Sequence, residues 1–474
     1  MSEGLLARLG LTGPDHAEAG AALLAQAEQA RLETVRVLFT DQHGLLRGKT
    51  VVASALPSIL RNGLAAPSTL LLKDTSHRTV FPVWSGDPGI GGDLMRGASD
   101  VLMVPDPASL RILPWAPHSA WLLADVVFRE GSPIPFAPRT VLARAEEALA
   151  AEGMAALMGL EVEFHVFDRL DSALDHARTT MPGAPVQTRA LTQGFQFLTE
   201  TRYAEAEGIL DTLRRAAQAM GMGVRSVEIE MGPSQFEFTF DPAPPMMQAE
   251  TMVLFRTLVK EVCAAKGLHA SFMAKPRLEN IAANGWHVHQ SVTSADGNIF
   301  AGDTLGAQAQ GWIAGLLAHA PALSLLMAPT VNSYKRYQPF QLAPNRIAWG
   351  RDNRGAMLRL LASPGDPASR VENRAPDSTA NPYYAFAGQI AAGLDGIAQG
   401  LPLQPETLSP YDGTAPLLPT SLAAAIEAFE GSAMLRAAFG DTFVDYLARI
   451  KRAEWERYLA TVSEWEQAEY FNLF

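Results

Sequence analysis

The chain has 474 residues, of which 48% are apolar, and 38 Lys and Arg against 50 Asp and Glu give it a formal net charge of −12 at neutral pH. This apolar content is enough to bury a large core and excludes disorder as the main state, while the acidic balance argues against a nucleic-acid scaffold. The single cysteine, Cys263, excludes an intrachain disulfide framework and a zinc-thiolate cluster, so we expect it to be a core residue. The first residues lack the pattern of a secretory signal, and we expect a cytoplasmic protein with no nucleic-acid or membrane partner.

The first part of the chain is predicted to form a small domain that begins with a helix over Leu5–Arg31. The alternation of apolar and polar residues predicts strands, the first two of which flank a turn and form a hairpin: Thr34–Thr40, Arg47–Val52, Asp100–Pro105 and Trp121–Phe128. Prolines are frequent between residues 105 and 138 and indicate a boundary. We therefore expect one domain over residues 1–130 and a second over residues 131–474.

The second part is predicted to be a large mixed sheet with helices packed around it, which is an α+β fold. Its expected strands are Ala156–Phe167, Gly223–Met231, Gln235–Phe240, His269–Met273, Gly285–Val292 and Asn345–Gly350. Its expected helices are Arg139–Glu152, Tyr203–Met220, Gln248–Ala265, Gly306–Met327, Tyr383–Ala398 and a helical tail over Leu422–Leu473. The helix over Gly306–Met327 lacks charged residues, but Pro321 interrupts it, so we expect a buried core helix and not a membrane span.

Carboxylates recur in apolar surroundings in this second part. In Leu160-Glu161-Val162-Glu163-Phe164 the two glutamates are two positions apart, so on a strand they point to the same face. A solvated strand face would explain such a pair on its own. In the run from Glu230 to Glu237, Gly232-Pro233 separates two strands and brings further carboxylates towards one another.

The segment Gly285-Trp286-His287-Val288-His289 places two imidazoles on one strand face, which fits either a metal site or two ordinary histidines. Several glutamates with one ligating histidine suit a hard cation, Mg²⁺ or Mn²⁺, better than zinc. No Walker loop occurs, so phosphate groups would have to be held by metal ions and arginines.

Arginines are dense after residue 335, and any one of them alone could belong to a solvated face. In Arg370-Val371-Glu372-Asn373-Arg374 the three charged side chains share one strand face, so a carboxylate could bind metal while its neighbours bind anions. The arginines of this stretch that concern us are Arg336, Arg351, Arg354, Arg359, Arg370 and Arg374.

Together these segments resemble the glutamine synthetase superfamily over nearly the whole chain. The motifs follow the family order: Gly159-Leu160-Glu161-Val162-Glu163-Phe164, Glu230-Met231-Gly232-Pro233-Ser234-Gln235-Phe236-Glu237-Phe238, Phe272-Met273-Ala274-Lys275-Pro276, His287-Val288-His289-Gln290-Ser291, Asn332-Ser333-Tyr334-Lys335-Arg336 and Arg370-Val371-Glu372-Asn373-Arg374-Ala375-Pro376-Asp377. The resemblance implies an N-terminal β-grasp domain and a catalytic domain with a curved antiparallel sheet surrounded by helices. It also implies a homo-oligomer, expected as a dodecamer of two hexameric rings, in which the N-terminal domain of a neighbour completes each active site.

The resemblance further implies which side chains hold each ligand. One Mg²⁺ or Mn²⁺ ion would be held by Glu163, Glu230 and Glu237, and a second, on the ATP phosphates, by Glu161, His287 and Glu372. ATP would contact His289, Ser291, Arg359 and Arg370, and L-glutamate would contact Arg336, Arg374 and Gly285. Arg354, Arg336 and the acidic Asp100 match positions that act in the reaction.

The chain departs from the ammonia-using members of the family at one informative position. Those members carry Gly-Tyr-Glu-Ala-Pro after the Asn-Ser-Tyr-Lys-Arg motif, and the glutamate helps to remove a proton from ammonium. Here the stretch is Pro339-Phe340-Gln341-Leu342-Ala343-Pro344, and Leu342 can neither accept a proton nor attract a cation. The residues before the metal-site histidine also differ, as Ala282-Ala283-Asn284-Gly285-Trp286.

Apolar surface at this position favours an organic amine over ammonia. The pattern resembles the γ-glutamylamide ligases, which make γ-glutamylanilide, γ-glutamylisopropylamide or γ-glutamylpolyamines, and the predicted amine pocket is Leu342, Phe340, Tyr337 and Trp286. Such an enzyme would join the γ-carboxylate of L-glutamate to an apolar or aromatic amine through γ-glutamyl phosphate. The alternatives are a glutamine synthetase that uses ammonia and a non-catalytic relative with a binding or structural role. Tyr411 matches a nucleotidylated tyrosine of some relatives too poorly for us to expect its modification.

Overall fold

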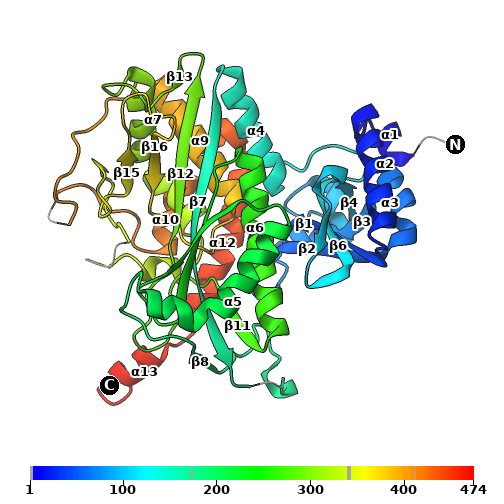
Figure 1. Ribbon diagram of the computed structural model, residues 1–474, viewed down its shortest axis with the longest axis horizontal. Coiled ribbons are helices and arrows are strands. Elements are labelled where there is room, and N and C mark those ends of the chain that lie inside the picture. The colour runs from blue at the N-terminus through cyan, green and yellow to red at the C-terminus, as the bar shows by residue number, and fades with distance from the viewer. Residues whose placement is uncertain (1–3, 172–173, 339–342, 412) are drawn as a thin grey trace.

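The structure is a computed structural model that describes residues 4–171, 174–338, 343–411 and 413–474. In Figure 1 a small N-terminal sheet with its helices lies beside a larger body built on long strands. The mixed α+β architecture that the sequence predicts is therefore confirmed. The last strand of the small sheet, β6, ends at Phe128, and the first helix of the larger body, α4, begins at Pro138. The predicted division after residue 130 falls between them.

The small sheet has the strand order β2-β1-β6-β4-β3, with β5 paired to β6. The predicted hairpin is confirmed, because β1 and β2 pair antiparallel from Thr34 opposite Val52 to Thr40 opposite Leu46. Strand β1 also runs parallel to β6. The elements of this part are α1 (Leu5–Arg8), α2 (Pro14–Gln29), β1 (Thr34–Thr40), β2 (Leu46–Val52), α3 (Leu56–Asn62), β3 (Leu64–Pro67), β4 (Asp100–Pro105), β5 (Arg111–Leu113) and β6 (Ala116–Phe128).

The single leading helix expected over Leu5–Arg31 is wrong, because α1 and α2 are separate. Gly10 has a φ of 69°, in the left-handed region where glycine is favoured, and Pro14 occupies the first turn of α2. A glycine after one helix and a proline at the start of the next are ordinary stop and start signals.

The large sheet has the strand order β14-β15-β16-β12-β7-β10-β9, and β8 and β11 pair with β7 while β13 pairs with β12. Apart from the parallel pair β14–β15, the paired strands run antiparallel. The strands are β7 (Ala155–Arg169), β8 (Thr188–Ala190), β9 (Val224–Ile229), β10 (Gln235–Phe240), β11 (Leu268–Ser271), β12 (Trp286–Ser294), β13 (Gly297–Asn298), β14 (Trp349–Arg351), β15 (Leu358–Leu361) and β16 (Arg370–Asn373). The predicted strand Asn345–Gly350 is thus shorter and shifted towards the C-terminus.

Helices cover one face of this sheet and build the core there. The ring of Phe164 on β7 lies 5.8 Å from that of Phe255 on α6 and 5.7 Å from that of Phe238 on β10. Because side chains alternate along a strand, the glutamates between these aromatic residues face the other side. The helices are α4 (Pro138–Ala151), α5 (Glu200–Ala219), α6 (Pro245–Ala265), α7 (Ala307–Ala318), α8 (Ala320–Met327), α9 (Pro382–Ala398), α10 (Leu422–Glu430), α11 (Ala433–Phe439), α12 (Asp441–Leu459) and α13 (Glu464–Tyr470).

The apolar segment expected as one helix over Gly306–Met327 is two helices, α7 and α8, which meet at an angle of 72°. Pro321 lies in the first turn of α8, where its missing N–H costs nothing, and so sets the start of the second helix. Most of their side chains are buried in the core. Within the described residues no single helix has the length and hydropathy to cross a membrane, and this bent pair meets those criteria only when taken together.

The chain ends in a short helix, α13, that projects from the larger body (Figure 1). Apolar side chains are exposed on it and on the residues that flank it on both sides: Leu459, Val462, Trp465, Phe471, Leu473 and Phe474.

Candidate active site

The register of the large sheet brings the predicted carboxylates and histidines into one cluster. Glu163 on β7 stands opposite Glu237 on β10, and Glu161 on β7 stands opposite His287 on β12. Glu372 on β16 stands opposite His289 on β12. Four neighbouring strands therefore present their charged side chains side by side, on the face that the helices leave uncovered.

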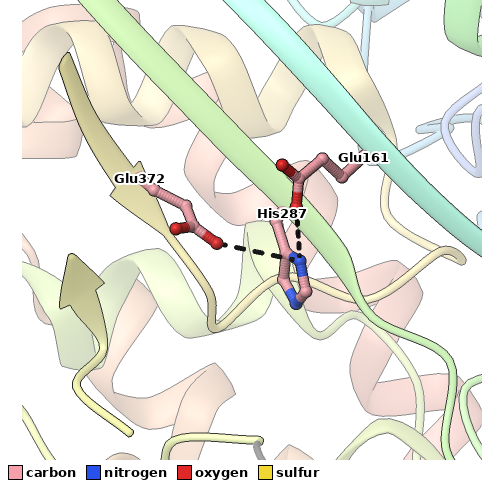
Figure 2. Close-up of side chains that lie close together, drawn as sticks. All are labelled: Glu161, His287 and Glu372. Atoms are coloured by element: carbon pink, nitrogen blue, oxygen red, sulfur yellow. Dashed lines mark hydrogen bonds and ion pairs between the residues drawn. The ribbon is translucent and has the colours of Figure 1, made fainter. Parts of the chain in front are cut away.

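Glu161, His287 and Glu372 form one half of this cluster (Figure 2). His287 Nδ1 lies 3.1 Å from Glu161 Oε2 and 3.8 Å from Glu372 Oε1. One ligand atom from each of the three residues lies within 4.8 Å of the others, which is close enough for all three to reach one cation.

Glu163, Glu237 and His287 form the other half, again with one ligand atom from each within 4.8 Å of the others. His287 Nε2 lies 3.8 Å from Glu163 Oε1, so this imidazole stands between the two halves. Glu230, predicted on the strand Gly223–Met231, follows the last residue of β9, and its Oε2 accepts a 2.9 Å hydrogen bond from the backbone N–H of Met231. It belongs to neither of these groups in the described part of the chain, although Glu163 is near enough to raise its pKa.

The carboxylates near Glu163 have raised pKa values. Burial, and then repulsion from Glu163, raise the pKa of Glu230 to about 8. Burial, and then repulsion from Glu163 and Glu161, raise the pKa of Glu237 well above its ordinary value. Bringing like charges together in a desolvated place favours the neutral form unless a cation compensates them.

The carboxylates of the other half are compensated by neighbouring cations. Burial works to raise the pKa of Glu161, but hydrogen bonds with His287 and His289 outweigh it and the pKa is lowered. Burial likewise works to raise the pKa of Glu372, but the charges of His287 and Arg374 outweigh it, and the pKa is lowered.

Arginines border the Glu372 side of the cluster. Arg359 Nη1 lies 3.1 Å from Glu372 Oε2, and Arg374 forms a second ion pair with the same carboxylate. Arg370 Nε donates a 3.0 Å hydrogen bond to His289 Nδ1. All three members of the Arg370-x-Glu372-x-Arg374 pattern therefore contact the cluster.

Gly285 lies at the centre of the cluster, where there is no room for a side chain. A Cβ atom on Gly285 would lie 3.0 Å from His287 Nε2, 3.1 Å from Glu163 Oε1 and 3.2 Å from Arg336 Nη2. The backbone N–H of Gly285 donates a 2.7 Å hydrogen bond to Glu163 Oε2. Arg336 and Arg374 are both buried, and the Nε atom of each is without a hydrogen-bond partner among the described residues.

The remaining predicted residues lie at various distances from this centre. Ser291 follows His289 on β12 and donates a hydrogen bond to the carbonyl of Ser369, while Arg354 is exposed after β14. Tyr337 is half-buried and its hydroxyl donates to the carbonyl of Ala375. Phe340 and Leu342 lie outside the described residues.

Asp100 starts β4 in the small N-terminal sheet, which lies beside the larger body (Figure 1), and it belongs to neither of the two groups described above.

The prediction that Trp286 lines the amine pocket is wrong. Its ring is fully buried and packs against Phe386 on α9, with a centroid separation of 5.5 Å. Trp286 precedes His287 on β12, so the alternation of the strand turns it to the helix-covered face.

Sequence reasoning missed several polar residues that hold the glutamates in place. Gln235 Nε2 donates to Glu163 Oε2 at 3.3 Å and to Asn284 Oδ1 at 3.0 Å. Ser378 Oγ donates to the carbonyls of Glu163 and Gly285 at 2.6 and 2.8 Å. Gln235 and Asn284 lie within segments that the sequence singled out, whereas Ser378 is brought here only by the tertiary fold.

The donor set is that of a hard divalent cation. Carboxylate oxygens dominate and a single imidazole joins both halves, which suits Mg²⁺ or Mn²⁺ and not the nitrogen and sulfur ligands typical of zinc. Arginines at one edge add fixed positive charge of the kind that binds phosphate and carboxylate groups.

Comparison with known proteins agrees with this arrangement. The family model described as glutamine synthetase, catalytic domain, matches residues 135–470. The chain is 36% identical over 477 residues to a γ-glutamylanilide synthase from an Acinetobacter species, with 95% of each chain covered. It is 35% identical to a γ-glutamylethanolamide synthetase from Streptomyces coelicolor, with 92% of each covered. It is also 30% identical to a glutamine synthetase of Methanosarcina mazei, over 95% of this chain and 97% of that one.

A solved structure of GmaS without ligand superposes with a TM-score of 0.79 at 31% identity, covering 95% of this chain and 99% of that chain. The resemblance inferred from the sequence is confirmed, and so is the expected fold class.

Proposed function

The chain belongs to the glutamine synthetase family, and we propose that it is an ATP-dependent ligase that joins the γ-carboxylate of L-glutamate to a small organic amine. The observation that carries the proposal is the cluster of Glu161, Glu163, Glu237, His287 and Glu372, which arginines border on one side. A relative that had become a purely structural protein would gain nothing from crowding these carboxylates, because each buried charge without a counter-ion is costly.

Two divalent cations, Mg²⁺ or Mn²⁺, would be held here. Glu161, His287 and Glu372 would hold one, and Glu163 and Glu237, with Glu230 beside them, would hold the other. When bound, these ions supply positive charge to the transferring phosphoryl group and to the carboxylate that receives it.

The arginine edge would bind the ATP phosphates. Arg359 and Arg370 lie next to Glu372 and His289, and Ser291 follows on the same strand. The exposed Arg354 would add a further donor for the phosphoryl group on this side. Fixed guanidinium groups of this kind stabilise the charge that develops as the phosphoryl group is transferred.

L-Glutamate would lie between Gly285 and the buried arginines. Arg336 and Arg374 carry unpaired N–H donors and lie beside the carboxylates, so they can orient the substrate carboxylates without solvent competition. The absence of a side chain at Gly285 lets His287, Glu163 and Arg336 approach its backbone closely.

The reaction proposed has two steps. The γ-carboxylate oxygen of glutamate attacks the terminal phosphorus of ATP, the bond to ADP breaks, and γ-glutamyl phosphate forms. The nitrogen of the amine then attacks the γ-carbonyl carbon, phosphate leaves, and the nitrogen loses a proton to give an N-substituted γ-glutamylamide. This reaction requires no covalent intermediate with the enzyme. Cys263, the single cysteine, is a buried core residue and has no role in it.

We propose that the amine is apolar or aromatic. Leu342 occupies the sequence position where ammonia-using members carry a glutamate, Phe340 lies two positions before it, and the half-buried Tyr337 precedes both in the chain. The two γ-glutamylamide synthetases among the relatives support an amine substrate. An arylamine is uncharged near neutral pH and therefore needs no carboxylate to take its proton before it attacks.

We also propose a cytoplasmic dodecamer of two hexameric rings, with an N-terminal domain over residues 1–130 and a catalytic domain over residues 131–474. The exposed apolar side chains of the C-terminal segment, Trp465 and Phe471 among them, support burial against another copy of the chain. Asp100, which lies in the small sheet, would act in the active site of a neighbouring subunit.

The test is turnover with a panel of amines. The purified protein is incubated with L-glutamate, ATP and Mg²⁺ together with aniline, isopropylamine, ethanolamine, putrescine or ammonium, and both ADP and the mass of the product are measured. We expect the largest kcat/KM with aniline or isopropylamine. Full turnover with ammonium alone would identify a glutamine synthetase, and no turnover with any amine would favour the non-catalytic alternative.

A further inference from the structure

A cavity of about 230 Å³ lies where the N-terminal part of the chain meets the catalytic part. The turn between β1 and β2 forms one wall, through residues 42–45, and α6, α8 and α12 form the others. None of the metal-cluster residues lines it. A cavity of about 150 Å³ is enough to hold benzene, so this one has room for a single ring or a short alkyl chain with a polar group attached.

The wall of the cavity is mainly apolar. Phe272, Leu325, Leu326 and Leu447 are all buried and together line it. The apolar part of a ligand would be stabilised by leaving water and packing against these side chains. Small-molecule sites are generally apolar in this way.

The charged residues that line the cavity are all basic: Arg256, Lys260 and Lys451, with no Asp or Glu among the lining residues. Lys451 is paired with Glu454 at 3.3 Å, but Arg256 and Lys260 form no ion pair with any residue in the described ranges. Arg256 is buried and donates only to backbone carbonyls, those of Gly44, Ser378 and Ala380.

Three cations therefore line the cavity, while the carboxylates that attract Arg256, those of Asp41 and Asp377, are not among the lining residues. Burial lowers the pKa of Arg256 to about 10. Desolvation, and then repulsion from Arg256, also lower the pKa of Lys260, although the Lys260 side chain is exposed to solvent. Two neighbouring cations that repel each other, with no carboxylate beside them in the wall of the cavity, favour the binding of an anion there.

We propose that this cavity binds a small monocarboxylate with an apolar body, such as one aromatic ring or a short alkyl chain, with the carboxylate at Lys260 and Arg256 and the body against the leucines. A multiply charged phosphate suits the site less well, because the greater part of the wall is apolar. The site is separate from the reaction described above, so it takes neither ATP nor the amine.

A ligand in this cavity would contact a segment that is hydrogen-bonded to the metal-site backbone. Ser378, Thr379 and Asn381 line the cavity, and Ser378 Oγ donates to the carbonyls of Glu163 and Gly285. Asn381 Nδ2 donates a 3.1 Å hydrogen bond to the carbonyl of Asp41 in the β1–β2 turn. A bound carboxylate would therefore brace the turn of the N-terminal part against the segment that holds the metal-site backbone.

Isothermal titration calorimetry on the full-length protein without nucleotide tests the proposal. The probes are phenylacetate and hexanoate, with the neutral phenylacetamide and inorganic phosphate for comparison. We expect phenylacetate to bind at least about tenfold more tightly than phenylacetamide, because a charge-assisted hydrogen bond is lost with the charge. ADP with Mg²⁺ should not displace it.

A matched pair of variants on α6 and its end locates the binding. Lys260→Met keeps the stem of the side chain and removes the charge that lines the cavity, whereas Lys266→Met removes an exposed charge that does not line it. We expect about tenfold weaker phenylacetate binding in the first variant and none of this loss in the second. As an independent check, Leu447→Phe should weaken binding by filling the cavity.

Several results would overturn the proposal: equal affinity in Lys260→Met and Lys266→Met, tighter binding of phosphate than of phenylacetate, displacement by ADP, or no binding of either carboxylate at millimolar concentration. Because binding is measured without turnover, these results are distinct from a failure of the proposed ligase reaction, which the amine panel tests.

Discussion

The binding of Mg²⁺ to this protein should release protons, and Glu230 is the residue whose contribution can be worked out. Burial and the nearby Glu163 raise its pKa to about 8 in the metal-free protein. At about pH 7 a group with that pKa is about nine-tenths protonated, and at about pH 8 it is about half protonated. A carboxylate must lose its proton to ligate a cation, so Glu230 alone should release about 0.9 proton per site at pH 7.

The same protonation sets the pH dependence of affinity. Competition from the proton weakens metal binding by a factor of about 11 at pH 7 and of about 2 at pH 8, so affinity for Mg²⁺ should rise about fivefold over that unit. Glu237, whose pKa burial and Glu163 also raise, acts in the same direction. Both groups are protonated below their raised pKa values, so the affinity for the metal ion increases as the pH rises through those values.

Calorimetry of Mg²⁺ binding in buffers of different ionisation enthalpy counts the protons released. Glu230→Gln should release about one proton fewer than the parent protein at pH 7 and should lose most of the fivefold pH dependence. Glu146→Gln is the matched control, because burial also raises the pKa of Glu146 but this residue lies on α4 outside the cluster. A proton count that is near zero in the parent protein, or equal in the parent and in Glu230→Gln, would refute the assignment of Glu230 to the metal site.

Three further changes have expected outcomes. Gly285→Ala should lower glutamate-dependent ADP formation by more than about tenfold, because its Cβ would lie about 3 Å from His287 and Glu163; a thermal melt like that of the parent protein would place the defect in the site. Ser378→Ala removes two hydrogen bonds that hold the backbone of Glu163 and Gly285 and should lower the free energy of unfolding by about 1–2 kcal/mol, measured in urea, and raise the Mg²⁺ concentration needed for turnover; unchanged values of both would contradict that role. Burial raises the pKa of Cys263 to about 12, so a thiol reagent at about pH 8 should modify it only after unfolding, and rapid labelling of the native protein would contradict its burial.

The sequence predicts what depends on local periodicity. On β7 the alternation of apolar residues with Glu161 and Glu163 predicts a strand with one core face and one charged face, and the structure has that strand. The same rule places His287 and His289 on one face of β12. It also explains the error at Trp286, because this residue directly precedes His287 and its ring therefore points to the opposite face, into the core.

What the sequence alone does not predict is the register between strands that are far apart in the chain. Glu163 stands opposite Glu237, and His289 opposite Glu372, only because of pairings across more than 70 residues. The motifs shared with a known family supply that information indirectly, as the ligand sets they imply. Nothing local marks Ser378, or the meeting of Arg256 with the β1–β2 turn, because each depends on how the two parts of the chain pack.

The two halves of the cluster differ in their charge balance, and the difference bears on whether the chain is an enzyme. Glu372 is paired with Arg359 and Arg374, and its pKa is lowered, so that half is tolerable without metal. Glu237 and the neighbouring Glu230 have raised pKa values. Their carboxylates repel Glu163 when ionised, and only protons or a cation can relieve this repulsion. A protein kept only for its shape would be more stable with glutamines at these positions. Their presence as glutamates is physically understandable if a divalent cation is bound there during a reaction, beside fixed arginines whose remaining N–H donors can hold a phosphorylated substrate.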